Sequence, residues 1–306
     1  MPEITIEQWY IDTYEQNVLH GLQQKESRLE PYVRSVELKG EKRRFNYLGS
    51  RTMKEIKGKW EDTEIEDSKH KVRWVFDKRF GDAFSMDEND IEYAFTDPTS
   101  DMTVAGINAA LRLKDELIIK AFYGNAIEGH DADEIAAYPS TQRLNIQLGS
   151  PASGAANQGL NIEKLKMAAF YLDRAETNPD DTRIFTCTAY QIKNMLDQIE
   201  ATSADYTPVK ALYEGKVDHF MGFKFVKTQL LPWAANIRSC TAFTSSAMGL
   251  AIRKGITVKS ASVPTKNFDL LTQLQMRGGA VRIYDKGVVD IPCAEPEEYL
   301  ASSDEF

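Results

Sequence analysis

The sequence of 306 residues has few of the side chains on which catalytic sites and covalent frameworks are usually built. It contains only four histidines and three cysteines, and both sets are widely spaced. Cys187, Cys240 and Cys293 fit neither a disulfide framework nor a pair of zinc knuckles. We therefore expect three reduced, mostly buried, small apolar side chains. The histidines stand in segments of different character, so a triad or metal centre would need distant loops to converge.

Long apolar runs are also missing. No uninterrupted apolar segment approaches the roughly 20 residues that cross a bilayer. Residues 1–10 lack the basic and apolar regions of a secretory signal, so we expect synthesis in a cytosol and no membrane partner. The net charge is −9, and an acidic chain is repelled by phosphate backbones as a whole. Because 42% of the residues are hydrophobic, a sizeable core is expected.

The short motifs of nucleotide and metal chemistry are incomplete. Gly154 and Gly159 have the spacing of a phosphate-binding loop, but Leu160 and Asn161 follow where lysine and serine or threonine are needed. The sequence therefore predicts no nucleotide site and no cofactor.

An acidic run, HDADE at 130–134, places three carboxylates beside a histidine. Ile135 stands where the calcium-loop pattern requires an oxygen ligand, so a solvated acidic loop is the better interpretation. A metal-assisted hydrolase built on Asp131 and Asp133 stays an alternative that alanine at both positions would test.

Helical periodicity is clear in several segments. A capping-box pattern at Thr5 precedes an amphipathic helix whose aromatic face includes Trp9, Tyr10 and Tyr14. The clearest helix spans 99–124, with Gly124 just beyond its end and a core stripe. Its members are Val104, Ile107, Leu111, Ile118 and Phe122. Further helices are expected at 161–176, at 189–201 and, ending at Gly255, at 244–255.

Other segments predict strands. Residues 183–189 form a short buried strand, and residues 219–232 are strand-like with a break at Gly222. Residues 270–295 predict two or three strands joined at Gly278–Gly279 and at 285–287, and an acidic tail that frays from 295. Strict βαβ alternation is absent, so the order favours an α+β fold over a doubly wound sheet.

The most unusual segment is a charged, strand-like ribbon at 43–80 with a turn near 58–67. Residues 39–79 contain 13 basic and 8 acidic side chains, so the rest of the chain carries −14. The charges are sorted along the ribbon and flank Trp60. The first limb carries Arg51, Lys54, Lys57 and Lys59, and the tip carries Glu61, Asp62, Glu64, Glu66 and Asp67.

A ribbon of this composition needs a partner surface. A polar two-stranded hairpin is marginal in water because it buries too little to offset the entropy of ordering it. Sorted opposite charges favour docking on a protein with the reciprocal pattern. Basic residues interleaved with aromatics, such as Arg43, Arg44 and Phe45 with Arg73 and Trp74, would also suit single-stranded nucleic acid, although the acidic tip opposes that alternative.

Together these segments resemble the major capsid proteins of tailed bacteriophages, which share the Hong Kong 97-like fold. The resemblance is carried by DAFSMD, DPTS and AALRLKDELIIKAFYGNA in 82–126, by GKVDHFMGFKFVKT in 215–228, by MGLAIRKGI in 248–256 and by MRGGAVRIYDKGVVDIPC in 276–293. Sequence motifs carry the resemblance over about residues 80–293. Over residues 1–80 only the order of the predicted segments is similar.

The resemblance implies a domain plan. Residues 1–38 would form an N-terminal arm, 39–80 an extended β-hairpin loop, and 161–262 an axial domain. A peripheral domain would combine 81–160 with 263–293 and contain the long helix at 99–124, called the spine helix in this family. Residues 294–306 would be the acidic tail.

The implied function is a non-enzymatic shell subunit in a virion capsid, assembled in the cytoplasm of a host bacterium. Its copies would form pentamers and hexamers of an icosahedral shell around double-stranded DNA, without sequence specificity. A portal, a decoration protein and a separate scaffolding protein are expected partners, since only about 80 residues precede the globular part. An encapsulin-like compartment and a single-strand-binding protein are the alternatives.

We predict that reversing the charges of Arg51, Lys54, Lys57 and Lys59 together leaves subunit folding nearly intact but impairs shell closure. The reason is that these side chains would bind a neighbouring subunit rather than the core of their own. Circular dichroism measures the fold, and negative-stain imaging measures the yield of closed particles. Normal particles from this variant would contradict the role of the ribbon.

Overall fold

The computed structural model describes residues 24–48, 53, 70–86, 98–150, 156–178, 180–199, 219–265 and 269–297. Within these ranges the fold is α+β, as predicted. The helices are η2 (Glu30–Tyr32), α2 (Pro98–Tyr123), η3 (Ser140–Gln142), α3 (Ile162–Arg174), α4 (Ala189–Ile199), η4 (Ser245–Ala247) and η5 (Asp285–Gly287). None of these described helices combines the length and apolar character needed to cross a membrane.

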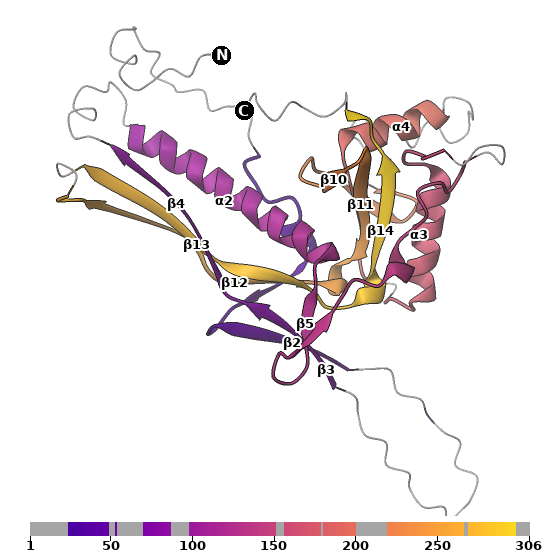
Figure 1. Ribbon diagram of the computed structural model, residues 1–306, viewed down its shortest axis with the longest axis horizontal. Helices are drawn as coiled ribbons and strands as arrows, with labels where there is room; N and C mark the ends of the chain where they lie inside the picture. Colours follow the sequence, from indigo (N-terminus) through magenta and orange to yellow (C-terminus); the bar gives the residue numbers. More distant parts are fainter. Residues whose placement is uncertain are drawn as a thin grey trace, which may run out of the picture.

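The described strands form three sheets (Figure 1). A long sheet has the order β1-β12-β13-β4 and contains β1 (Arg34–Glu37), β4 (Lys78–Met86), β12 (Met248–Ser262) and β13 (Leu270–Arg282). The ribbon sheet has the order β2-β3-β5-β6 and contains β2 (Lys42–Leu48), β3 (His70–Phe76), β5 (Ala126–Glu128) and β6 (Glu134–Ala136).

The third sheet lies in the more compact half of the molecule. Its order is β10-β11-β7-β9-β8, with β14 paired to β11. The strands are β7 (Arg183–Cys187), β8 (His219–Phe220), β9 (Phe223–Lys227), β10 (Trp233–Ala234), β11 (Ile237–Thr244) and β14 (Val288–Ala294). The main core lies here: Leu165 and Leu172 of α3, Phe185, Phe243 and Ile291 are all fully buried. Strand β7 buries four of its five residues and β9 buries three of five, so neither shows the regular alternation of a half-exposed strand.

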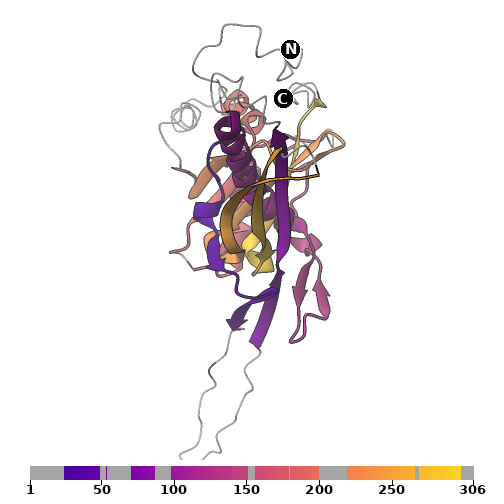
Figure 2. The same ribbon diagram turned by 90° about the vertical axis from the view of Figure 1, so that its left-hand side faces the viewer.

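Helix α2 lies along one face of the long sheet, and the turned view in Figure 2 shows them as two layers. Gly106 allows this close approach, because a Cβ there would lie 2.8 Å from Cδ2 of Leu274 on β13. Ile118 and Phe122 are buried as predicted, but Val104 is 40% exposed. Ile107 and Leu111 are half-buried, so the predicted core stripe is confirmed only in its last part and is wrong at Val104.

The end of α2 is fixed by close packing. Gly124 follows the last helical residue, as predicted. A Cβ at Gly124 would lie 2.7 Å from the carbonyl oxygen of Lys120, so glycine is required there by space. The guanidinium of Arg282 donates from Nη1 to the carbonyl oxygens of Phe122, at 2.7 Å, and Gly124, at 3.0 Å. A cation at this end also complements the helix dipole.

Three secondary-structure predictions are confirmed within one or two residues: α3, β7 and α4. The expected break at Gly222 is confirmed too, since it separates β8 from β9 and has a φ of +79°. The three cysteines are free and buried, as expected.

The predicted helix at 244–255 is wrong. The segment forms the short turn η4 and then enters β12, where Leu250 pairs with Ala280 of β13 on one side and with Ser35 of β1 on the other. Met248–Ala251 is fully buried, and a short buried apolar run cannot be assigned to helix or strand from periodicity alone. Gly255 lies inside this strand, and β1 lies within the range 1–38 that the resemblance assigns to the N-terminal arm.

The predicted join at Gly278–Gly279 is also wrong, because β13 continues through both residues. The glycines serve close packing instead. A Cβ at Gly278 would lie 2.6 Å from the carbonyl oxygen of Ala251, and one at Gly279 would lie 2.8 Å from that of Phe76. The second predicted join is confirmed at η5. The frayed tail does not begin at 295, since Glu295 is 1% exposed.

We predict that Gly279→Ala lowers the free energy of unfolding by about 1–3 kcal/mol, because the new methyl group meets backbone atoms that have no room to move. Gly255→Ala is the matched control: it lies in β12, and nothing surrounds its Cβ position within 4 Å. Urea denaturation of both variants measures the effect. Equal stabilities would contradict the close approach of β3 to β13.

Candidate functional site

The residues singled out by the sequence for contact between subunits lie outside the described residues. They are Trp9, Tyr10, Tyr14, Arg51, Lys54, Lys57, Lys59, Trp60, Glu61, Asp62, Glu64 and Glu66. The structure does describe the elements from which the predicted ribbon leaves the body. The candidate site is therefore built from the ribbon base, which we define as β2 and β3, and from the surfaces around it.

The ribbon base has a small core that joins it to the rest of the subunit. Strands β2 and β3 are antiparallel, with Lys42 opposite Phe76 at one end and Leu48 opposite His70 at the other, and β3 also pairs with β5. Phe45 and Val75 are 4% and 3% exposed and pack in a cluster with Ala251 and Ile283 of the long sheet and its extension. Burial of two such side chains contributes about 2–3 kcal/mol each. The ribbon base thus has a core contribution that the sequence pattern did not indicate.

A charge cluster fixes the ribbon base to η5 and α2. Arg73 on β3 is 2% exposed, and its Nη2 donates to Oδ2 of Asp285 at 2.6 Å. The other carboxylate oxygen, Oδ1, accepts from Nε of the fully buried Arg282 at 2.6 Å. Glu128 of β5 lies 3.1 Å from Arg73. Asp285 therefore connects the ribbon to the arginine that holds the end of α2.

The corner between the ribbon and the long sheet depends on Asp77. Its side chain is 3% exposed, and Oδ2 lies 3.1 Å from Nη1 of Arg253 and 2.7 Å from Nη2 of Arg277. These arginines belong to β12 and β13. One carboxylate therefore fixes the place where the chain passes from β3 into β4.

The segment leading in from the N-terminus is fixed to α2 by a buried carboxylate. Asp115 is fully buried, and it accepts hydrogen bonds from the side chains of Gln24 and Ser27 and from the backbone N–H groups of Arg28 and Leu29. The backbone bonds are both 3.0 Å long. These bonds fix residues 24–29 against α2.

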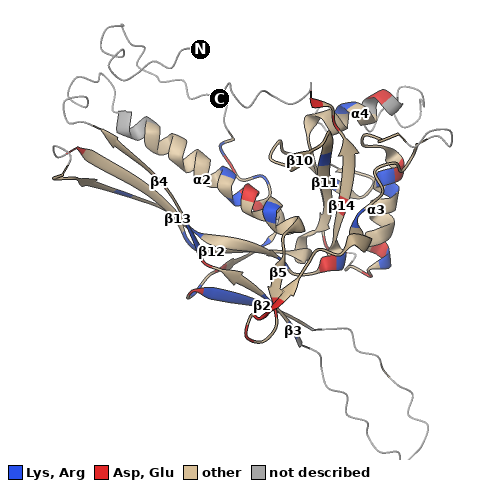
Figure 3. Ribbon diagram, viewed as in Figure 1, with Lys and Arg blue, Asp and Glu red and all other residues tan. Residues whose placement is uncertain are grey.

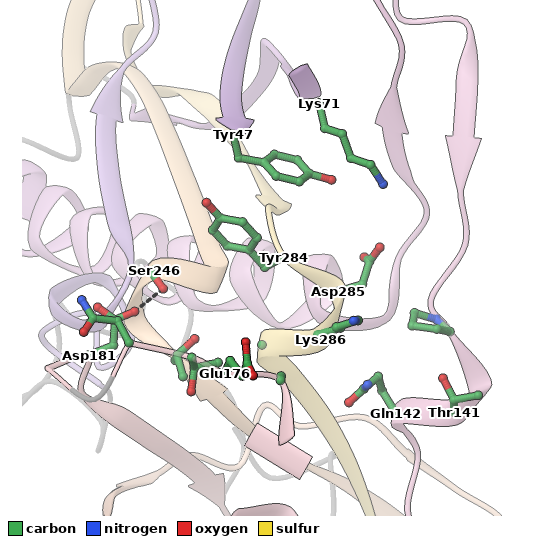
Figure 4. Close-up of a pocket in the computed structure, with 16 residues that line it drawn as sticks. Tyr47, Lys71, Thr141, Gln142, Glu176, Asp181, Ser246, Tyr284, Asp285 and Lys286 are labelled. Atoms are coloured by element: carbon green, nitrogen blue, oxygen red, sulfur yellow. Dashed lines mark hydrogen bonds between the residues drawn. The ribbon is translucent and has the colours of Figure 1, made fainter. Parts of the chain in front are cut away.

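A cavity of about 730 Å³ lies between the ribbon base and the compact half (Figure 4). Tyr47 and Lys71 line it from the ribbon, and Tyr284 lines it from the turn at η5, where the Tyr47 and Tyr284 rings meet edge-on with centroids 4.9 Å apart. Asp181 and Ser246 hydrogen-bond to each other on the opposite side. The lining is polar and of mixed charge, with no histidine or cysteine among the described lining residues.

The titratable groups with shifted pKa values lie inside the packed body. Burial raises the pKa of Asp290, although Arg143, 3.1 Å from its Oδ2, opposes that effect. Burial lowers the pKa of Lys164, whose Nζ donates to the carbonyl oxygens of Gln158 and Pro292. Neither group lines the cavity, so these shifts accompany interior packing rather than an acid–base pair in a cleft.

The acidic run at 130–134 lies in the loop between β5 and β6. The side chains of His130 and Asp131 are 91% and 85% exposed. Among the described residues no group of three potential ligands lies close enough to hold a metal ion. This exposure agrees with a solvated acidic loop.

The residues that organise this region were not identified from the sequence. Arg73 was noted only as part of a basic and aromatic pattern, and Asp77, Asp115 and Asp285 were not singled out. Only the fold shows that the side chains of Arg73, Asp77 and Asp115 are buried, that Asp285 is partly buried, and which cations or donors surround each carboxylate. A buried carboxylate is revealed by its partners, which are up to 212 positions away in the chain.

A comparison with protein families matched residues 6–295 to the model described as phage capsid protein. Among curated proteins, none matched the chain.

Solved structures with a similar fold include three capsids. The capsid of Ralstonia phage GP4 is 10% identical with a TM-score of 0.74, over 95% of this chain and 96% of that one. The capsid of cyanophage P-SCSP1u is 16% identical with a TM-score of 0.69, over 93% of each chain. The capsid of an empty GTA particle is 12% identical with a TM-score of 0.63, over 94% and 97%.

We predict that Asp285→Asn lowers the free energy of unfolding by about 3–5 kcal/mol, because it leaves two buried guanidinium groups without their shared carboxylate. Lys286→Gln, at the exposed neighbouring position, is the control and should change stability by less than about 0.5 kcal/mol. Chemical denaturation measures both. If the two variants were equally stable, Asp285 would not hold the ribbon base.

Proposed function

The chain belongs to the phage capsid protein family, whose members are structural rather than enzymatic and share the Hong Kong 97-like fold, and from this premise we propose that it is the shell-forming subunit of a tailed phage. Its copies assemble as pentamers and hexamers into an icosahedral shell. The shell encloses double-stranded DNA without sequence specificity, as a component of the virion capsid.

The observation that carries this proposal is the way the ribbon is fixed. Arg73, Asp285 and Asp77 hold the ribbon base against the body, and Phe45 and Val75 bury its inner face. Strands β2 and β3 are therefore firmly fixed at the two points between which residues 49–69 lie in the chain. We propose that these residues lie over an adjacent subunit, where Arg51, Lys54, Lys57 and Lys59, with Trp60, supply contacts.

The long sheet supports the same proposal. From Arg253 to Ser262, β12 has no buried side chain, and Val258 is 40% exposed. A narrow sheet of this kind with α2 on one face leaves its other face open to a partner. In a shell of repeated copies, that partner is another subunit, and many modest interfaces add up to a closed particle.

We assign the parts of the subunit accordingly. The N-terminal arm, residues 1–38, passes along α2 at Asp115, and residues 39–80 form the extended loop. The peripheral domain, residues 81–160 and 263–293, contains α2, β4 and β13, and the axial domain, residues 161–262, contains α3, α4 and most of the third sheet. A scaffolding protein, a portal and a decoration protein are the further partners that we propose.

Two other functions can be told apart from the proposed one by what the protein encloses or binds. A compartment of the encapsulin kind would hold a cargo protein and no nuclease-protected DNA. A single-strand-binding protein would bind oligonucleotides with a strong dependence on salt. The net charge of −9 disfavours the second of these.

We predict that replacing residues 49–69 by an Asn–Gly turn abolishes particles but leaves the subunit folded. Leu48 and His70 are direct partners across the ribbon, so a two-residue turn can join them. Sedimentation should show at least a roughly tenfold loss of particles, while the free energy of unfolding stays within about 1 kcal/mol of the wild type because the small core and charge cluster remain.

The matched control is His130→Ala with Asp131→Ala, two exposed changes on the neighbouring loop that should leave particle yield unchanged. Nuclease protection then tests for double-stranded DNA inside particles recovered from producing cells. Particles that form normally from the shortened chain would overturn the assigned role of the ribbon. A wild-type chain that forms no particles would overturn the proposed function.

A further inference from the structure

The long sheet carries cations where pairing rules disfavour them. Lys254 on β12, Arg277 on β13 and Arg79 on β4 are direct partners across three adjacent strands. Directly opposed side chains lie about 4.5–5.5 Å apart at Cβ, and like charges at that distance destabilise a sheet. A β-bulge places Arg253 beside Lys254 in the same row. We call Arg79, Arg253, Lys254 and Arg277 the cation row.

The cation row lies on the face of the sheet opposite α2. Leu274 faces α2, since its methyl groups lie next to Gly106. Because side chains alternate along a strand, Arg277 points to the opposite face, and its partners Arg79 and Lys254 point there with it. Figure 3 shows blue positions on the long sheet near β12.

The charge of the cation row is only partly neutralised within the described part of the chain. Asp77 pairs with Arg253 and Arg277. Arg79 and Lys254 are exposed, and no described carboxylate forms an ion pair with either of them. The nearby Glu37 pairs with Lys39 instead, at 3.7 Å. The face therefore keeps an excess of positive charge in a protein whose net charge is −9.

We infer that the cation row is the docking surface for the acidic ribbon tip, residues 61–67, of a second copy of this chain. The inference rests on the proposed function and names the partner surface for the ribbon. The tip carries five carboxylates within seven residues: Glu61, Asp62, Glu64, Glu66 and Asp67. In an extended conformation Asp62, Glu64 and Glu66 would share one face, with about 6.6–6.8 Å between successive members.

The dimensions of the two surfaces agree. Three adjacent strands place the outer cations of the row about 9–10 Å apart, and the long arginine and lysine side chains can reach three alternate carboxylates of an extended segment, which span about 13 Å. Nucleic acid fits less well, because outside residues 39–79 the chain carries −14 and would repel the phosphates on either side of the row. Between two proteins, by contrast, a few complementary charges fix how the two surfaces are aligned and exclude wrong partners.

Zero-length carbodiimide cross-linking tests the contact directly, because it joins a lysine amine to a carboxylate only where they are in contact. Wild-type particles made from a mixture of ¹⁴N- and ¹⁵N-labelled chains should give peptides that join Lys254 of one copy to an acid within 61–67 of another. Particles in which Lys254 is joined instead to the acidic C-terminal residues, or to no carboxylate, would overturn the inference and leave the proposed function standing.

A charge swap tests whether the contact matters. Arg79→Glu with Lys254→Glu should lower particle yield at least about tenfold, because it sets like charges against each other, and so should Glu64→Lys with Glu66→Lys. Combining all four changes should restore the yield to within about twofold of the wild type. Lys166→Glu with Arg174→Glu, at exposed positions of α3, is the control of equal charge change.

Three results would contradict the docking surface. The four-fold variant could fail to recover, or Arg79→Glu with Lys254→Glu could give normal particles. Normal particles with a lower DNA content would show that the cation row binds nucleic acid instead. A wild-type chain that forms no particles contradicts the proposed function itself.

Discussion

The arrangement of the subunit depends on one carboxylate shared by two buried arginines. Asp285 accepts from Arg73 of the ribbon and from Arg282 of β13, and Arg282 in turn donates to the last carbonyl oxygens of α2 and lies over the ring of Tyr138, 5.0 Å from its centroid. Ribbon, helix and the loop after β6 thus meet at a single turn. Removal of a buried ion from water is costly unless it is paired, so these contacts favour the orientation in which Asp285 reaches both arginines. Apolar contacts alone would tolerate small rotations of the ribbon, whereas this cluster does not.

That constraint explains how a polar ribbon can belong to a stable subunit. The small core around Phe45 and Val75 and the ion pairs of Asp77 fix its base, so folding of the subunit does not require the partner surface. Under the proposed function, residues 49–69 and the face of the long sheet opposite α2 are the surfaces that bind a partner. Stability and association are therefore separated along the chain: buried charges near the junction specify shape, and exposed charges farther out specify neighbours.

The sequence predicts the helices and the short buried strands well, because α2, α3 and α4 have periodic apolar faces or long apolar runs of their own. Prediction from the sequence fails where contacts between distant segments determine the local structure. Met248–Ala251 has the same apolar character in a helix or a buried strand, and only its pairing with β1 and β13 makes it a strand.

Gly278 and Gly279 have the sequence pattern of a turn, although their role is to let β12 and the end of β3 approach β13. Glu295 reads as part of an acidic tail, although Arg238 binds both of its carboxylate oxygens in the interior. Buried charge cannot be recognised until its partner is in place.

Some charged side chains of the long sheet hold the fold, and others remain available to bind another molecule. Asp77 neutralises Arg253 and Arg277, which allows two cations to stand near one another on adjacent strands, but it leaves Arg79 and Lys254 in the row without a described counter-charge. A sheet that served only its own subunit would place opposite charges at such cross-strand positions, because that choice stabilises the pair instead of straining it. The excess of like charge is a cost to the isolated subunit. An acidic surface from another molecule, as proposed, would remove that cost and would thereby favour the assembled state over the free one.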